Sequence, residues 1–584
     1  MAGLDKSQLL SAMREALPAA ALAAGRDIDP SSLDLTVGAL DPATGRVSVE
    51  LTATARKKLT VEAAAAAPAL PKPQAQRPSD PPSSGFVGRI FKIRTASIGG
   101  RPYRSAVALR SLPGGAIVSS EGALATQVLA GQAGRFCAGC VRPFGGGRPK
   151  KKCAGGCEYT YYCSRKCQVA HHPLHKHTCK RFQGIVGAAL DLYGKLSPAP
   201  DFAFPLEDFL LLRTLHLTLC ARAEPPVSPK SLSIPPLPPS VASLVPAPPR
   251  PAEDSFLSLA ASLSFSLPAP PGPSHFLSLL LASRANNFGV LTPLQTTVAH
   301  GVYPTAATLN HSCDPNCVLT YDGATQIIRT IRDVEAGEEL FHSYCDLTAP
   351  TATRRAHLKE IYGFDCECRR CLGKVEGLDE RELEKKKGGG LSEDEQRRVE
   401  AALAGAEAAA AGEEDDYPRE YALIMEALQL QRAKLGRYNL DLYKTEARAL
   451  GVSMLLENAD VDERIRHAKH CHDFLDYTCS ENHPLVLLQA MTLAELYEAS
   501  GHPPHLRLAG DMYGRIARGC QVCYGKDHEY VQLYQKREKK ALNEYKGDDP
   551  KEGFQTQDEG GAAGAARRAH MHWGRKQEYY QPRF

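Results

Sequence analysis

The chain has 584 residues, which is more than one hydrophobic core usually organises, so about two to four domains are expected. Hydrophobic residues make up 43% and charged residues 23%, as in globular proteins, whereas 42 prolines and 48 glycines predict long non-globular connections. A net charge of +4 over this length gives no electrostatic argument for nucleic-acid binding. Because no run of about eighteen apolar residues occurs, no membrane span is expected.

The cysteine content is interpreted through the compartment in which the chain is expected to reside. The N-terminus lacks a basic segment followed by an apolar one, and its first fifty residues include Asp5, Glu15 and Asp27, which argues against a secretion signal or a transit peptide. We therefore expect a protein of the cytoplasm, the nucleus or both. Disulfides are rare there, so the short spacings among the eighteen cysteines indicate metal binding.

The segments before the cysteines are an extension and a β unit. Residues 1–84 begin with an amphipathic helical pattern, continue with a predicted strand pair at Leu33–Val37 and Arg46–Ala53, and end in an Ala- and Pro-rich stretch. We assign no function to this extension. Residues 85–136 are predicted to begin as a small all-β unit, because β-rich runs alternate with turn residues such as Pro113–Gly115.

The second half of the chain changes character several times. A helical stretch from Ile185 to Ala223 precedes a Pro- and Ser-rich insertion, residues 224–274, that is expected to be disordered. A β-rich domain resumes near Phe276. Residues 374–416 are charged and rich in Gly and Ala, so a linker that packs no core is predicted. Beyond it, amphipathic helices such as Leu485–Ala499 repeat, which predicts helix pairs stacked as a short solenoid.

The first cysteine cluster provides eight metal ligands in four closely spaced pairs. Thiolates and an imidazole at two- or three-residue separations are the donors that structural zinc prefers, and eight of them make two tetrahedral sites. The pairs are Cys137 and Cys140, Cys153 and Cys157, Cys163 and Cys167, and His175 and Cys179.

The run from Cys163 to Cys179 resembles the MYND finger, with Gln168 after the sixth ligand. In that family the two zinc ions interleave. The resemblance therefore implies that Cys137, Cys140, Cys163 and Cys167 hold one ion and that Cys153, Cys157, His175 and Cys179 hold the other. It also implies Pro-rich peptide partners, although His172 stands where the family has Trp. The basic loop Arg148–Lys152 is interpreted as a solvated loop, with DNA contact as the alternative.

Three further segments resemble the SET domain and its post-SET extension. They are Asn310-His311-Ser312-Cys313-Asp314-Pro315-Asn316, then Glu339-Leu340-Phe341-His342-Ser343-Tyr344, then Tyr362 to Cys371. SET enzymes transfer a methyl group from S-adenosylmethionine to a protein lysine of a histone or another protein. Three thiolates at Cys366, Cys368 and Cys371 lack a fourth, which the resemblance supplies as Cys313, giving a third zinc site.

The SET resemblance also implies roles for single residues. Tyr344 matches the catalytic tyrosine, and Tyr362 and Phe364 match the walls of the lysine channel. The residues that match cofactor contacts are Arg104, Asn286, Asn310, His311, Tyr344 and Phe364. The other seven cysteines are interpreted as packing residues; they are Cys220, Cys317, Cys345, Cys471, Cys479, Cys520 and Cys523.

Together these features resemble the SET-and-MYND (SMYD-type) lysine methyltransferases, which implies a monomeric, multidomain α+β protein with a mainly β SET domain split by the finger. The domains expected are an N-terminal extension (1–84), the first part of the SET domain (85–136), the finger (137–179), a helical insertion (180–275), the second part of the SET domain (276–350), the post-SET zinc segment (351–373), a charged linker (374–416), tetratricopeptide-like helices (417–546) and a flexible tail (547–584).

One departure from the family keeps a second hypothesis open. Relatives carry Gly-x-Gly where this chain has Tyr103-Arg104-Ser105, and glycine lets the backbone approach a cofactor closely. The alternative to an active enzyme is therefore a catalytically weak or inactive adaptor that binds protein partners through its finger and helices.

Overall fold

The computed structural model describes residues 33–41, 46–53, 87–98, 101–145, 150–157, 160–176, 179, 214, 282–283, 285–411 and 416–546. The chain divides into two compact units, residues 1–73 with 128–183 and residues 74–127 with 184–584. Outside the described residues lie the predicted N-terminal helix, the Ala- and Pro-rich stretch, the helical stretch before the insertion apart from Thr214, the insertion and the tail. No helix in the described part of the chain is long and apolar enough to cross a membrane.

The first unit contains a strand pair and the finger. Strands β1 (Leu33–Asp41) and β2 (Arg46–Ala53) pair antiparallel with Leu33 opposite Ala53, which confirms the predicted strand pair. The finger region contributes the following elements: η3 (Ala130–Gln132), β7 (Lys151–Lys152), β8 (Tyr161–Tyr162) and α2 (Arg165–His175). Ser164 caps α2 by accepting a hydrogen bond from the backbone N–H of Cys167.

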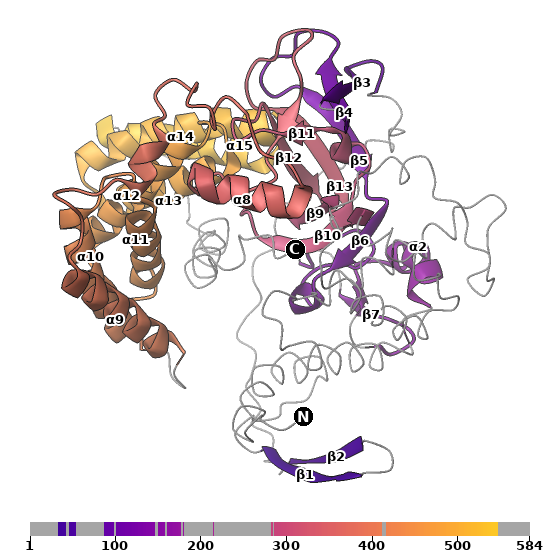
Figure 1. The fold of residues 1–584 in the computed structure, drawn as a ribbon, viewed down its shortest axis with the longest axis horizontal. Coiled ribbons are helices and arrows are strands. Elements are labelled where there is room, and N and C mark those ends of the chain that lie inside the picture. Colours follow the sequence, from indigo (N-terminus) through magenta and orange to yellow (C-terminus); the bar gives the residue numbers. More distant parts are fainter. Residues whose placement is uncertain are drawn as a thin grey trace. The chain divides into compact units, whose positions relative to one another are not determined.

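Short strands form the β region of the second unit (Figure 1). They are β3 (Phe91–Ile98), β4 (Arg101–Ala108), β5 (Ile117–Gly122), β6 (Ala125–Val128), β9 (Asn287–Leu291), β10 (Thr297–Val302), β11 (Asn310–His311), β12 (Cys317–Asp322), β13 (Thr325–Thr330) and β14 (Phe341–His342), with η4 (Ala306–Thr308) between β10 and β11. β3 pairs with β4, β11 pairs in parallel with β14, and two three-stranded sheets have the orders β12-β13-β5 and β6-β10-β9.

Segments before and after the finger form this β region together. β5 pairs antiparallel with β13, Gly122 lying opposite Thr325. The backbone N–H of Ala116 also donates to Thr330 Oγ1, 214 residues away. The turn predicted at Pro113–Gly115 occurs, and Gly115 has a φ of +87°, which favours glycine. The finger is therefore an insertion into a β domain that its two flanks complete.

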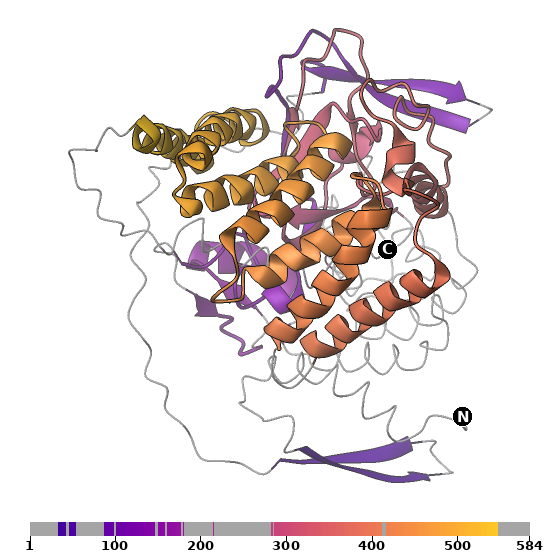
Figure 2. The same ribbon diagram turned by 90° about the vertical axis from the view of Figure 1, so that its left-hand side faces the viewer.

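Helices follow the sheets in the second unit. They are α8 (Thr351–Tyr362), η5 (Glu380–Glu384), α9 (Glu393–Ala410), α10 (Tyr417–Lys434), α11 (Leu440–Ser453), α12 (Val461–Thr478), α13 (Pro484–Ser500), α14 (Pro503–Tyr524) and α15 (Glu529–Lys546). From α9 to α15 each helix packs against the next (Figure 2), as the predicted helical array requires. Its core is aliphatic and aromatic, with Leu450, Phe474 and Tyr513 at 0% exposure.

The prediction that residues 374–416 pack no core is wrong. Leu383 of η5 is buried, and Val399 and Ala402 of α9 pack with Ala427 of α10. A capping box at Ser392 and Glu395 starts α9. Charged residues and alanine are good helix formers, so a composition typical of linkers here builds a helix whose alanine face lies against its neighbour.

Candidate active site and metal centres

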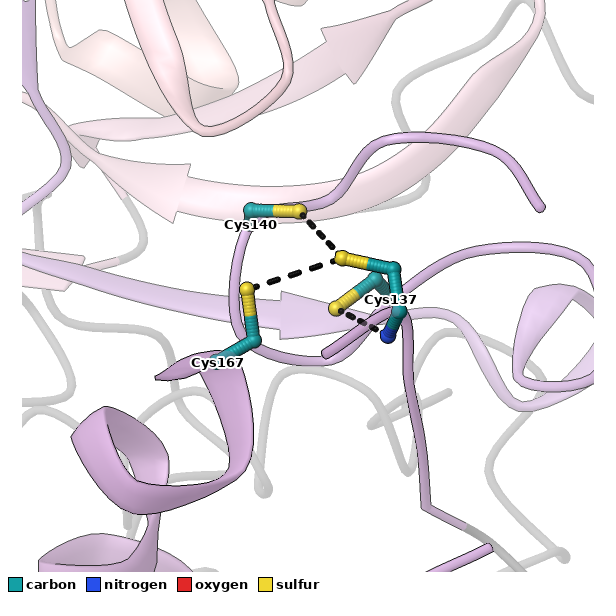
Figure 3. A group of neighbouring side chains, drawn as sticks. Cys137, Cys140 and Cys167 are labelled. Carbon is teal, nitrogen blue, oxygen red and sulfur yellow. Dashed lines mark hydrogen bonds between the residues drawn. The ribbon is translucent and has the colours of Figure 1, made fainter. Parts of the chain in front are cut away.

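The finger brings together the four cysteines assigned to the first zinc ion. Figure 3 labels three of them, Cys137, Cys140 and Cys167. The Sγ atom of Cys163 lies 3.6 Å from the Sγ atoms of both Cys140 and Cys167. The backbone N–H of Cys163 donates to Cys137 Sγ at 3.3 Å. A hydrogen bond with the Cys140 thiol lowers the pKa of Cys137, which favours the thiolate form that binds zinc.

The second set in the finger also converges. His175 Nε2 lies 3.0 Å from Cys153 Sγ and 3.4 Å from Cys157 Sγ, and Cys153 Sγ lies 3.5 Å from Cys179 Sγ. The backbone N–H of Gly155 donates to Cys153 Sγ at 3.3 Å, as an amide that stabilises a thiolate does. Each of these four residues offers one ligand atom, and the four atoms lie within 4.8 Å of one another.

Zinc fits the spacing of these donors. Zinc binds thiolate sulfur at about 2.3 Å with tetrahedral geometry, so two sulfurs of one site lie about 3.7 Å apart. The sulfur–sulfur distances of 3.6 Å and 3.5 Å in the finger agree with that edge. No disulfide links the described cysteines, so their sulfurs are available as ligands.

His171 is a finger residue whose contribution the sequence analysis did not find. Its Nδ1 lies 3.0 Å from the hydroxyl of Tyr162, and its ring stacks on that of His175 with the centroids 5.8 Å apart. Burial lowers the pKa of His171 to about 4, so the ring is neutral beside the zinc site. The i, i+4 spacing of His171 and His175 on α2 was the available signal.

The third cluster joins two segments of the second unit. Cys313 from the loop after β11 meets Cys366, Cys368 and Cys371, and their ligand atoms lie within 4.8 Å of one another. Cys313 Sγ and Cys371 Sγ are 3.7 Å apart, which again matches a tetrahedral zinc edge. The hydrogen bond with Cys313, followed by that with Cys366, lowers the pKa of Cys371 to about 6. The segment after α8 is therefore tied to the β domain.

Two further residues lie against this cluster. Cys345, interpreted as a packing residue, has its sulfur within 4.8 Å of the ligand atoms of His311 and Cys313. His311 Nε2 lies 3.2 Å from Cys313 Sγ, and His311 Nδ1 accepts the backbone N–H of Tyr344 at 2.9 Å. Because Nδ1 is an acceptor, the hydrogen of a neutral ring is on Nε2 and points to the sulfur. The imidazole thus connects the third metal site to Tyr344.

Tyr344 lies in a cluster of aromatic rings. Its hydroxyl donates to the carbonyl of Leu309 at 2.6 Å, and its ring centroid lies 4.8 Å from that of Tyr362. Phe364 follows, with ring centroids 6.4 Å from Tyr362 and 6.1 Å from His311. Burial raises the pKa of Tyr362, so its hydroxyl stays protonated. The structure therefore brings the three residues assigned to the lysine site together.

His342 is a second aromatic neighbour of Tyr344, at a centroid distance of 4.7 Å. It lies opposite His311 in the β11–β14 pair and contacts Phe288, 5.8 Å away. Burial lowers the pKa of His342 to about 3, so the ring is neutral. Its Nε2 is buried without a hydrogen-bond partner among the described residues. Nothing in the sequence pattern had singled it out.

The residues assigned to the cofactor are partly assembled. The Asn310 side-chain amide donates to the carbonyl of Arg104 at 2.5 Å and to Glu339 Oε1 at 2.7 Å, so β4 and β11 meet at this point. Asn286 is buried and donates to the carbonyl of Ala282 at 2.8 Å. The side chain of Tyr103 lies outside the described residues.

Two known protein families match separate segments of the chain. The MYND finger family model matches residues 137–179 and the SET domain model matches residues 246–345. N-lysine methyltransferase SMYD2-B of Danio rerio is 24% identical over 406 residues, covering 69% of this chain and 87% of that protein. SMYD2 of Gallus gallus is 25% identical over 434 residues, covering 73% and 92%.

A human relative and a solved structure extend the comparison. Histone-lysine N-methyltransferase SMYD3 of Homo sapiens is 27% identical over 292 residues, covering 48% of this chain and 61% of that protein. The solved SET domain of LSMT bound to lysine and AdoHcy aligns with 77% of this chain and 88% of its own, at 12% identity and a TM-score of 0.23. The chain is therefore a multidomain α+β protein with a SET domain and a MYND finger, homologous to the SMYD2 and SMYD3 lysine methyltransferases.

Proposed function

We propose that this protein is an S-adenosylmethionine-dependent protein-lysine N-methyltransferase that holds three zinc ions. The observation that carries the proposal is Tyr344, held by hydrogen bonds to Leu309 and His311 and packed on Tyr362. Asn310 and Arg104, in contact with each other, support a cofactor site. The names of the relatives support the same reaction class.

In this proposal positioning supplies most of the catalysis. S-adenosylmethionine, when bound, provides an electrophilic methyl group on a sulfonium. For that methyl group to pass to a lysine, with S-adenosylhomocysteine as the leaving group, the site would have to orient the neutral amine toward the methyl group and exclude water. The Tyr344 hydroxyl, whose hydrogen points to the Leu309 carbonyl, offers its oxygen as an acceptor for the amine N–H. The faces of Tyr362 and Phe364 favour a cationic centre and keep the surroundings dry.

Calorimetric titration of S-adenosylmethionine into the zinc-loaded full chain tests the proposal, and absence of binding favours the adaptor instead. Labelled methyl transfer to proteins of a cell extract is the second measurement. Tyr344→Phe is expected to slow transfer about 100-fold or more, because one positioned dipole is lost, with the cofactor Kd changed less than about twofold. Tyr438→Phe, which removes a hydroxyl in the helical array, is the matched control and should retain full activity.

The partners follow from the same assignment. A protein substrate is required for lysine methylation, and we infer that the finger binds other proteins. Pro-rich peptides are our proposal for its ligands, supported by the family model and by exposed Val169 on α2. The monomeric state, DNA contact by the basic loop and residence in the cytoplasm or nucleus stay predictions.

A further inference from the structure

Arg354 is a fully buried charged residue whose role the sequence analysis did not anticipate. It lies on α8 with 1% of its surface exposed. Its Nε–H donates to Cys313 Sγ at 3.2 Å, and its Nη2 donates to Cys371 Sγ at 3.6 Å. One guanidinium therefore reaches two of the four sulfurs of the third zinc site, one from each segment that the site joins.

Glu380 holds the guanidinium in this position. Its Oε2 lies 3.0 Å from Arg354 Nη1, and its Oε1 accepts from Arg354 Nη2 at 3.2 Å. The same carboxylate pairs with Arg370 Nε at 2.5 Å. Arg370 is also buried, and its Nη1 donates to the carbonyl of Thr478 at the end of α12, 2.8 Å away. A continuous chain of charged hydrogen bonds thus runs from the sulfurs to the helical array.

Charge balance gives this arrangement its physical reason. Four thiolates around one divalent ion leave two negative charges in excess, and burying such a group is costly unless it is compensated. Arg354 and Arg370 each carry one positive charge and Glu380 carries one negative charge. Together the three side chains add one net positive charge beside the site. N–H bonds to a thiolate also stabilise the form that binds metal, and partners of this kind change metal affinity about 10- to 100-fold.

We propose that Arg354 is a positioning residue for the third zinc site: it stabilises the Cys313 and Cys371 thiolates, and Glu380 and Arg370 fix it there. Zinc retention in the post-SET segment therefore depends on α8, on η5 and on the docking of α12. This inference concerns metal binding and is independent of whether the protein transfers methyl groups.

Zinc competition with a chromophoric chelator on the full chain tests the proposal. Arg354→Met removes the charge and the donors at similar length, and we expect one of three zinc ions to bind about 10- to 100-fold more weakly. Alkylation of cysteines, located by peptide mass spectrometry, should then appear at Cys366, Cys368 and Cys371 before the finger. Lys359→Met is the matched control, because Lys359 is on the same helix and pairs with exposed Asp365 at 2.6 Å.

A spectroscopic measurement separates this role from simple packing. In the cobalt-loaded protein, loss of N–H bonds to sulfur should shift the sulfur-to-metal charge-transfer band in Arg354→Met but not in Lys359→Met. If Arg354→Met does not fold, Arg354→Lys, which keeps the charge but loses the planar pair of donors, is measured and should show a smaller change in the same direction. Wild-type zinc affinity together with an unshifted band in the folded variant overturns the proposal.

Discussion

Replacement of Gly139 by alanine is expected to weaken the first zinc site of the finger. Gly139 lies between the ligands Cys137 and Cys140. A Cβ atom there would lie 2.9 Å from both the Cβ and the carbonyl oxygen of Cys167, and 3.2 Å from its carbonyl carbon. Ordinary van der Waals contacts begin at 3.4 Å. The pair Cys137 and Cys140 must therefore move about half an ångström away from the pair Cys163 and Cys167.

The size of the effect follows from what can move. The clashing atoms belong to the first turn of α2, where the Cys167 N–H is bonded to the Ser164 cap at 3.2 Å, so the oxygen cannot shift alone. Forcing one methyl into such a packed site costs about 1 to 3 kcal/mol. If the whole cost falls on the metal-bound state, zinc binds about five- to 150-fold more weakly.

Zinc competition on the full chain, with alkylation mapping of the cysteines, measures this effect. The first site is expected to lose zinc before the other two. Gly131→Ala is the matched control within the same unit, because a Cβ there meets nothing within 4 Å. Unchanged affinity in Gly139→Ala, or equal losses in both variants, would refute the close approach of the two ligand pairs as the reason for glycine at this position.

Two further predictions concern stability. Burial opposes ionisation of Glu446, but hydrogen bonds with His467 and Arg432 outweigh it and lower the pKa of Glu446 from 4.5 to about 2. The ionised carboxylate therefore contributes about 3 kcal/mol to the free energy of unfolding. This contribution is present above pH 4.5 and is lost as the pH falls toward 2. Urea unfolding of wild type and Glu446→Gln should converge in that range; parallel curves would contradict the assignment. Asn316 is fully buried, and its side-chain amide donates to Glu338 and Glu339 and accepts the backbone N–H of Phe341 at 2.8 Å. Asn316→Ala should therefore lower the free energy of unfolding by about 2 to 3 kcal/mol in the same assay. A loss below about 0.5 kcal/mol would show that these bonds add little.

The sequence by itself predicted the features that depend on local chemistry. Ligand pairs at fixed spacing indicated the zinc sites of the finger, because chelation by neighbouring residues is decided within a few bonds. Helical periodicity in the same way located helices such as α13, and β propensity located the pair β1 and β2. The SET resemblance supplied Cys313 and Tyr344, which spacing alone could not connect to Cys366 or Tyr362.

Only the tertiary structure decided which distant groups share one environment. Arg354 and Glu380 are ordinary charged residues in the sequence, and Glu380 lies in a predicted linker, yet Arg354 contacts a sulfur of the third site and Glu380 pairs with Arg354. His342 and Cys345 likewise gain meaning only from their neighbours around Tyr344 and Cys313. The physical reason is that burial and charge compensation are properties of a three-dimensional neighbourhood, to which residues far apart in the chain contribute and which no local pattern records.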